Sequence, residues 1–247
     1  MGKEYTKRTI RLIFGLFLYG LGSYMGIQAN VGLAPWEAFS MGIFYKTGML
    51  YGDIVVLTGV VIIVIDFILK EKIGFGTVLN AIMIGKVVDL CNWLDFIPKM
   101  ENFAAGVAVL LAGQVVICIA SYFYIGACLG CGPRDALMVA MGKKLHKFPI
   151  GLVRGILEGT VLLLGWLMGA KVGIGTVIAV FGIGTIMEYT FKILRFDVRS
   201  IKHEDFADTI RRIAGKAEKA SGSQQLPTDS SASAGEATKS ATGSENR

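Results

Sequence analysis

Charged residues are scarce in this sequence of 247 residues, and long stretches of it contain none. Only 18% of the residues are charged, whereas soluble domains average about 25%. No charged side chain occurs over residues 12–36, 102–133 or 159–170. A helix needs about 20 apolar residues to cross a bilayer. These stretches therefore predict an all-α polytopic membrane protein and exclude an ordinary soluble domain.

Residues that enzymes commonly use are also scarce. The two histidines, His146 and His203, lie outside the apolar stretches, and the sequence has no zinc motif, nucleophile elbow or phosphate-binding loop. Cys128 and Cys131 have CxxC spacing, but no second such pair accompanies them, which argues against a metal or redox site. We therefore expect no enzymatic activity, no catalytic residue, no metal and no cofactor.

The chain does contain an internal repeat. Residues 32–38, Gly-Leu-Ala-Pro-Trp-Glu-Ala, match residues 130–136, Gly-Cys-Gly-Pro-Arg-Asp-Ala, at a shift of 98 positions. At a shift of 99, residues 74–78 match residues 173–177. Single glycines match by chance in a glycine-rich chain, but the shared proline, acid and alanine are more specific. We interpret the chain as two copies of one unit.

Each copy is predicted to hold three membrane spans and one short helix after its first span. The short helices begin at Pro35 and Pro133, because proline is favoured at the first helical position. The predicted spans are about 12–29, 53–69, 77–94, 103–129, 152–168 and 176–194. The predicted segments are a cytoplasmic N-terminus at 1–11, membrane repeats at 12–97 and 103–196, a cytoplasmic amphipathic helix at 197–220 and a disordered tail at 221–247.

The distribution of basic residues predicts that both termini are cytoplasmic. Most lysines and arginines lie in loops on one side, and the other side carries only Lys46, Lys99 and Lys171. Three spans per copy make the second copy enter from the opposite side, so the repeats are predicted to be inverted. We expect a multi-pass protein of the cell (cytoplasmic) membrane. Its expected partners are the lipid bilayer, a small solute and, as an open option, further copies of the chain; the net charge of +6 gives no reason to expect nucleic acid.

Charges within the predicted spans each cost about 2.5–3.5 kcal/mol, so each needs a partner or a function. Lys86 with Asp89, and Arg154 with Glu158, have the spacing to pair on one helix face. Asp89 and Glu188 occupy equivalent positions in the two copies, which makes them candidates for a coupling or ion site. The alternative is that both reach water at the ends of their helices.

The starts of the two short helices are the main candidate for a binding site. Free backbone N–H groups in the first turn of a helix attract anions, and the Arg134 guanidinium can bind a carboxylate or phosphate with two hydrogen bonds. The alternative is that Arg134 pairs with Asp135 or Glu158 and only stabilises the fold. The two helices are expected to be either gates at opposite ends of one path or re-entrant segments. The candidate substrate-binding residues are Pro35, Trp36, Glu37, Pro133, Arg134, Asp135, Arg154 and Glu158.

At these residues the sequence resembles the YczE/YyaS/YitT family of bacterial integral membrane proteins. The resemblance rests on residues 32–38 and 130–137, on Val153-Arg154 with Glu158, and on the glycines from Gly165 to Gly175, and it covers about 10–195. Glu37 stands where aspartate is expected in the family, and the chain is closer to the YczE branch than to members with a soluble C-terminal domain. The resemblance implies a fold and a membrane location, but no substrate.

Two functions from different classes fit these features. An inverted repeat with paired helix-breaking motifs favours a secondary transporter of a small anionic or zwitterionic solute. The lack of a recognisable ion-site motif favours a non-transporting membrane scaffold or a partner-binding subunit.

The predicted orientation can be tested with single cysteines. A cysteine in place of Lys99 should react with an impermeant thiol reagent added to intact cells, because that loop is predicted to lie outside. A cysteine in place of Lys144 should react only after the cells are permeabilised. The reverse labelling pattern would contradict the inverted arrangement, because both loops would then lie on the wrong sides.

Overall fold

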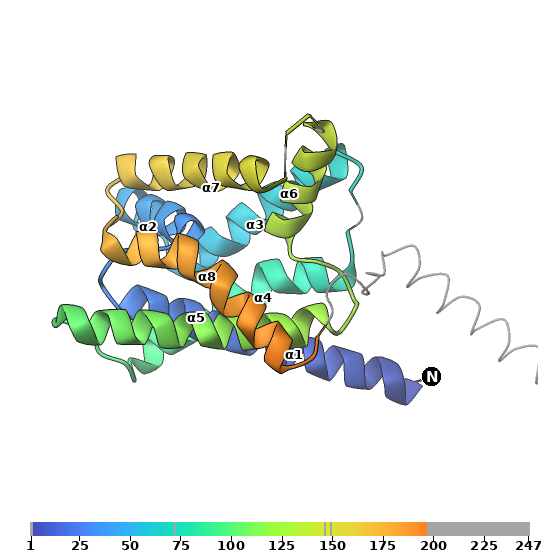
Figure 1. The fold of residues 1–247 in the computed structure, drawn as a ribbon, viewed down its shortest axis with the longest axis horizontal. Coiled ribbons are helices and arrows are strands. Elements are labelled where there is room, and N and C mark those ends of the chain that lie inside the picture. The colour runs from blue at the N-terminus through green and yellow to red at the C-terminus, as the bar shows by residue number, and fades with distance from the viewer. Residues whose placement is uncertain (1, 72, 146, 149, 197–247) are drawn as a thin grey trace, which may run out of the picture. The chain divides into compact units, whose positions relative to one another are not determined.

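A computed structural model describes residues 2–71, 73–145, 147–148 and 150–196. Within these ranges the regular structure is entirely α-helical (Figure 1). The helices are α1 (Gly2–Gln28), α2 (Pro35–Thr47), α3 (Tyr51–Ile68), α4 (Phe75–Leu94), α5 (Phe103–Ile125), α6 (Pro133–Lys144), α7 (Ile150–Leu167) and α8 (Ile174–Ile193). The amphipathic helix predicted at 197–220 and the tail predicted at 221–247 lie outside the described residues.

Five of these helices are long and apolar enough to cross a membrane. They are α1 from Tyr5 onward, α3, α4, α5 and α8. This confirms the prediction of an all-α polytopic membrane protein. The span predicted at 152–168 falls on α7, which contains both Arg154 and Glu158 and is not among the five. A sixth span on α7 therefore stays a prediction.

The short helices begin and end where local sequence signals place them. Pro35 and Pro133 open α2 and α6, and each follows a residue with extended backbone. Proline has no N–H to leave unpaired, so it fits the first position of a helix. Gly48 ends α2 in a left-handed conformation, with φ of 70°, which glycine adopts without strain. The basic residues Lys143 and Lys144 close α6.

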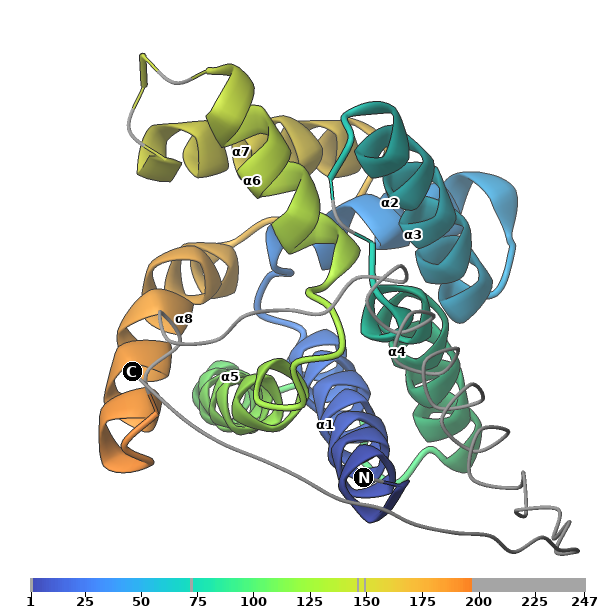
Figure 2. The same ribbon diagram turned by 90° about the vertical axis from the view of Figure 1, so that its right-hand side faces the viewer.

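The first helices of the two copies, α1 and α5, pack against each other through matched glycines. A Cβ atom added at Gly15 in α1 would lie 2.7 Å from the backbone nitrogen of Tyr124 in α5. A Cβ added at Gly113, its equivalent in α5, would lie 2.9 Å from the carbonyl oxygen of Gly22 in α1. Small residues allow helix backbones to approach this closely in membranes. In Figure 2, α4 lies beside α1 and α8 lies beside α5.

The two copies also bind each other through reciprocal backbone hydrogen bonds. The Gly76 N–H at the start of α4 donates to the Leu129 carbonyl at 2.7 Å, and the Gly175 N–H at the start of α8 donates to the Val31 carbonyl at 2.9 Å. The next residues, Gly32 and Gly130, have φ of 131° and 128°, a conformation that favours glycine. Each copy thus fixes the loop that leads into the other copy's short helix.

The copies differ in one interface. The second and third long helices of the first copy, α3 and α4, are in close contact, and a Cβ added at Gly85 would lie 2.5 Å from the Gly52 carbonyl oxygen. The equivalent residues in α7 and α8 are Gly151 and Gly184, and no described atom lies within 4 Å of a Cβ added at either. The α3–α4 interface is closed, whereas the α7–α8 interface is open.

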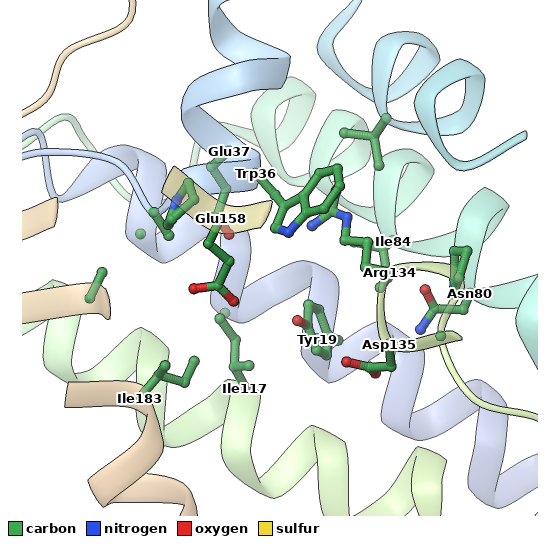
Figure 3. A pocket seen from close by; sticks show the side chains of 18 of the residues that line it. Tyr19, Trp36, Glu37, Asn80, Ile84, Ile117, Arg134, Asp135, Glu158 and Ile183 are labelled. Carbon is green, nitrogen blue, oxygen red and sulfur yellow. The ribbon is translucent and has the colours of Figure 1, made fainter. Parts of the chain in front are cut away.

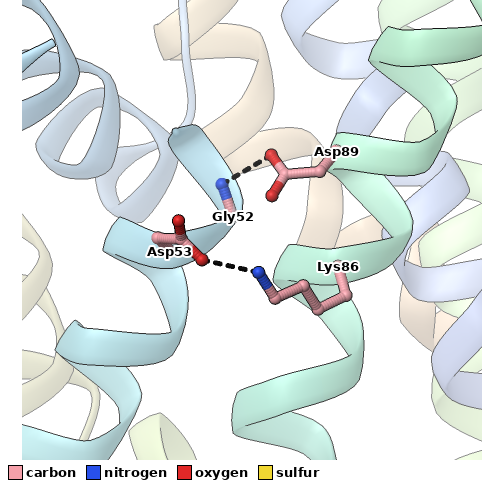
Figure 4. A network of polar contacts seen from close by, with 4 residues as sticks. All are labelled: Gly52, Asp53, Lys86 and Asp89. Atoms are coloured by element: carbon pink, nitrogen blue, oxygen red, sulfur yellow. Dashed lines mark hydrogen bonds and ion pairs between the residues drawn. The ribbon is translucent and has the colours of Figure 1, made fainter. Parts of the chain in front are cut away.

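Two polar contacts hold the α3–α4 interface together (Figure 4). The Asp89 carboxylate accepts a hydrogen bond from the Gly52 N–H at 2.7 Å, at the N-terminal end of α3. The Lys86 ammonium binds the Asp53 carboxylate at 2.5 Å. The predicted pairing of Lys86 with Asp89 is therefore wrong. Residues three apart on one helix can meet, but here α3 offers each of them a closer partner.

Glycine packing in α7 can be tested with a matched pair of alanine variants. A Cβ at Gly165 would lie 2.6 Å from backbone atoms of Ala38 and Phe39 in α2, whereas a Cβ at Gly155 on the same helix meets nothing within 4 Å. Gly165→Ala should destabilise the protein by about 1–3 kcal/mol through overpacking. Gly155→Ala should leave stability unchanged or raise it slightly. Thermal melting of purified protein in detergent measures both, and equal melting temperatures would contradict the packing described.

Candidate functional site

A cavity of about 160 Å³ lies where the starts of α2 and α6 meet (Figure 3). Residues of all eight helices line it. A cavity needs roughly 10–15 Å³ by the same measure to hold one water molecule. The space is therefore large enough for a small organic solute. Because α2 follows the first long helix of one copy and α6 the first of the other, both copies contribute equivalent walls.

All eight candidate substrate-binding residues line this one cavity. They are Pro35, Trp36, Glu37, Pro133, Arg134, Asp135, Arg154 and Glu158. The structure thus brings together two motifs that lie 98 positions apart in the chain. The expectation that the two short helices gate opposite ends of a path does not agree with this geometry, because both helices begin at the same cavity.

Arg134 at the start of α6 stacks on Trp36 at the start of α2. Its guanidinium carbon lies 4.7 Å from the centre of the indole ring. Figure 3 shows the two side chains next to each other. These two residues are equivalent in the repeat, so the copies touch here at matching positions. No ion pair among the described residues includes Arg134. Arg134 therefore does not pair with Asp135 or Glu158, which was the alternative hypothesis from the sequence.

Three of the other charged residues at the cavity, Arg154, Glu158 and Asp135, have side-chain partners of their own. Arg154 Nε donates to Glu158 Oε1 at 2.8 Å, which confirms the predicted pair on one face of α7. The Tyr124 hydroxyl on α5 donates to Asp135 Oδ2 at 2.9 Å. Such contacts offset the cost of placing charges within a membrane protein. They also fix the positions of Glu158 and Asp135 on the cavity wall.

Several polar residues of the cavity escaped the sequence prediction. Tyr19, Asn80, Gln114 and Tyr124 all line it. Gln114 is only 3% exposed, and neither its amide oxygen nor its amide nitrogen has a hydrogen-bond partner in the described part of the chain. The sequence signal that could have identified Gln114 is its position, as a polar residue, in the middle of a long charge-free stretch. A buried amide without partners favours a polar ligand, because unmade hydrogen bonds are costly.

Neither of the two candidate coupling residues lines the cavity. Asp89 in α4 contacts the start of α3, and Glu188 in α8 is exposed. Asp66 in α3 is a further acid outside the cavity; it is fully buried, and neither of its oxygens has a partner among the described residues. Within the described residues no three histidine, cysteine or acidic side chains form a group that could hold a metal ion.

Comparison with known proteins places this chain among related sequences. The model described as "Family of unknown function (DUF6198)" matches residues 6–192. An uncharacterized protein of Haemophilus influenzae is 31% identical over 74% of this chain and 83% of its own length. The Bacillus subtilis "Uncharacterized membrane protein YczE" is 28% identical over 77% and 88%, and "Uncharacterized protein YyaS" of the same organism 27% over 67% and 83%. These matches confirm the resemblance to YczE and YyaS; no solved structure matches significantly.

The partners of the two cavity arginines predict different responses to mutation. Arg134→Ala should cost only the stacking on Trp36, about 0.5–2 kcal/mol, and adding Glu158→Gln or Asp135→Asn should restore no stability. Arg154→Ala should lower the folded yield, because it leaves Glu158 without its partner, and Glu158→Gln should restore it. Size-exclusion yield and melting temperature measure both series. Rescue of Arg134→Ala by either second change would contradict the contacts described here.

Proposed function

The chain belongs to the family of unknown function DUF6198, and we propose that it is a secondary transporter that moves a small anionic or zwitterionic solute across the cytoplasmic membrane. The observation that carries the proposal is the cavity at which α2 and α6 both begin. Transporters built from repeats bind their solutes where broken helices of the two copies meet. Here that place holds charged side chains, an unpartnered amide and free helix N-termini.

The proposal includes six spans, with α7 as the fifth along the chain, arranged as two inverted repeats with both termini in the cytoplasm. The reciprocal hydrogen bonds from Gly76 to Leu129 and from Gly175 to Val31 support an axis that relates the two copies. The positive-inside distribution of lysine and arginine supports the orientation. The partners in this proposal are the lipid bilayer and the solute, and the protein is not an enzyme.

The unequal interfaces of the two copies support a transport cycle. With the proposed orientation, the closed contact between Gly52 and Gly85 lies toward the outside, and the open pair Gly151 and Gly184 lies toward the cytoplasm. Arg154 and Glu158 on α7 and Ile183 on α8 line the cavity beside that opening. We assign the structure to an inward-facing state, in which the solute enters or leaves between α7 and α8.

The outward-facing state follows by exchanging the two interfaces. In that state α7 and α8 would approach through Gly151 and Gly184, as α3 and α4 now do through Gly52 and Gly85. Glu188 would then accept the Gly151 N–H, as Asp89 accepts the Gly52 N–H. Asp89 and Glu188 serve in this scheme as residues that close the two gates alternately. This shared role in closing a gate would explain why Asp89 and Glu188 occupy equivalent positions in the repeat.

A cysteine pair can trap the proposed closed inner gate. The background should lack the four native cysteines, Cys91, Cys118, Cys128 and Cys131. Gly151→Cys with Gly184→Cys should form a disulfide under mild oxidation, because the equivalent glycines of α3 and α4 lie within the reach of such a bond. The disulfide should stop uptake of radiolabelled amino acids and carboxylic acids into proteoliposomes, and reduction should restore it.

Each single-cysteine variant serves as the control for that pair. If both cysteines react with a maleimide but never with each other, the exchange of interfaces is wrong. If the reconstituted protein moves none of these compounds and purifies with a stoichiometric protein partner, the alternative function of a scaffold or partner-binding subunit replaces the transporter.

A further inference from the structure

The charges around the cavity leave one cation, Arg134, and two anions, Glu37 and Asp135, without an ionic partner among the described residues. Arg154 and Glu158 bind each other, and Asp135 accepts a hydrogen bond from Tyr124. Arg134 and Glu37 remain, and neither takes part in any ion pair within the described residues. An unpaired charge in a membrane protein is costly, so a ligand that neutralises both would be favoured.

Arg134 is held in an orientation suited to an anion. Its guanidinium lies over the Trp36 ring, with the central carbon 4.7 Å from the ring centre, and this contact holds the group in place. A cation–π contact uses the charge of the group and none of its N–H donors, so these stay available to a carboxylate, which matches their paired geometry. Pro133 and Gly132 place Arg134 in the first turn of α6, where the helix dipole also favours negative charge.

Glu37 provides the opposite charge from the first turn of α2. Its neighbours are the Ser23 hydroxyl and the Ala34 backbone, neither of which carries a charge. Arg134 is near enough to act on Glu37 through space, although the two form no ion pair. Both lie near enough to act on the hydroxyl of Tyr19, as do Asp135 and Arg154, so these charges surround a common region of the cavity. A carboxylate with this environment suits an ammonium group.

We propose that the solute is a small zwitterion of the amino-acid type, with its carboxylate on Arg134 and its ammonium on Glu37. The proposal rests on the transport function above and names the class of its substrate. A simple anion would leave Glu37 unpaired beside a second negative charge. A simple cation would leave Arg134 unpaired beside a second positive charge. Gln114 is buried at the cavity wall with both amide atoms free, so it offers its N–H donors and its carbonyl acceptor to the rest of the solute.

Matched compounds that lack one charge test this assignment. The purified protein is heated with each common amino acid, with the corresponding carboxylic acid that lacks the α-amino group, and with the corresponding amine. For alanine these partners are propionate and ethylamine. At least one amino acid should raise the melting temperature, and its two single-charge partners should bind about tenfold or more weaker, because each loses a charged hydrogen bond.

Variants of the two residues separate their roles. Glu37→Gln should weaken amino-acid binding about tenfold or more while leaving the carboxylic acid unaffected, and Glu37→Asp should restore part of it. Arg134→Ala should abolish binding of both, and Arg134→Lys should restore it in part. The matched control is Arg11→Ala, because Arg11 also stacks on an aromatic ring, that of Tyr122 at 4.7 Å, but does not line the cavity.

The outcomes distinguish this inference from the transport function. If no amino acid stabilises the wild type, if the carboxylic acids bind as tightly as the amino acids, or if Glu37→Gln binds amino acids normally, the zwitterion is wrong. Flux of carboxylic acids without an amine would leave transport standing and remove only the zwitterion. Tight amino-acid binding without flux in proteoliposomes would leave the zwitterion standing and remove only the transport function.

Discussion

The backbone contact between the two copies holds in place the loops that lead into the short helices. Gly76 and Gly175 lie at the starts of α4 and α8, and each donates its N–H to the loop that precedes the other copy's short helix. A side chain at Gly76 would meet the Leu129 backbone, and one at Gly175 the Val31 backbone. The same contact holds Gly32 and Gly130 in a conformation that L-amino acids rarely adopt. The cavity therefore depends on glycine at these positions.

The two copies make the same contacts only where equivalent positions hold similar residues. The contacts that give the cavity its chemistry come from equivalent positions where the residues differ. Trp36 and Arg134 occupy the same place in the two copies, yet one is an aromatic ring and the other a cation, so they can stack on each other. Lys86 and Asp53 bridge α3 to α4, whereas the equivalent residues, Thr185 and Leu152, cannot form that ion pair. The α7–α8 interface thus lacks one of the polar contacts that hold the α3–α4 interface closed.

The polar residues of the cavity fall into two groups. Some are held in the cavity wall by side-chain partners, and others lack an ionic partner or a hydrogen-bond partner that a ligand can supply. Arg154, Glu158 and Asp135 have side-chain partners that hold them in place. Arg134 and Glu37 have no ionic partner among the described residues, Gln114 has no hydrogen-bond partner there, and all three line the cavity. In a low-dielectric surrounding an unmatched polar group costs more than a matched one contributes. A ligand that satisfies all three would add stability only to the bound state, which is the requirement for selective binding.

The sequence by itself determined the membrane class, the repeat, the helix starts at Pro35 and Pro133 and the pairing of Arg154 with Glu158, because these depend on composition and local spacing. Only the tertiary structure decided that Arg134 stacks on Trp36, that Lys86 binds Asp53 and not Asp89, and that Gln114 belongs to the cavity. Such contacts join residues far apart in the chain. Which residues meet depends on how closely the helices approach, and the glycine contacts set that distance through three-dimensional packing, which no local pattern encodes.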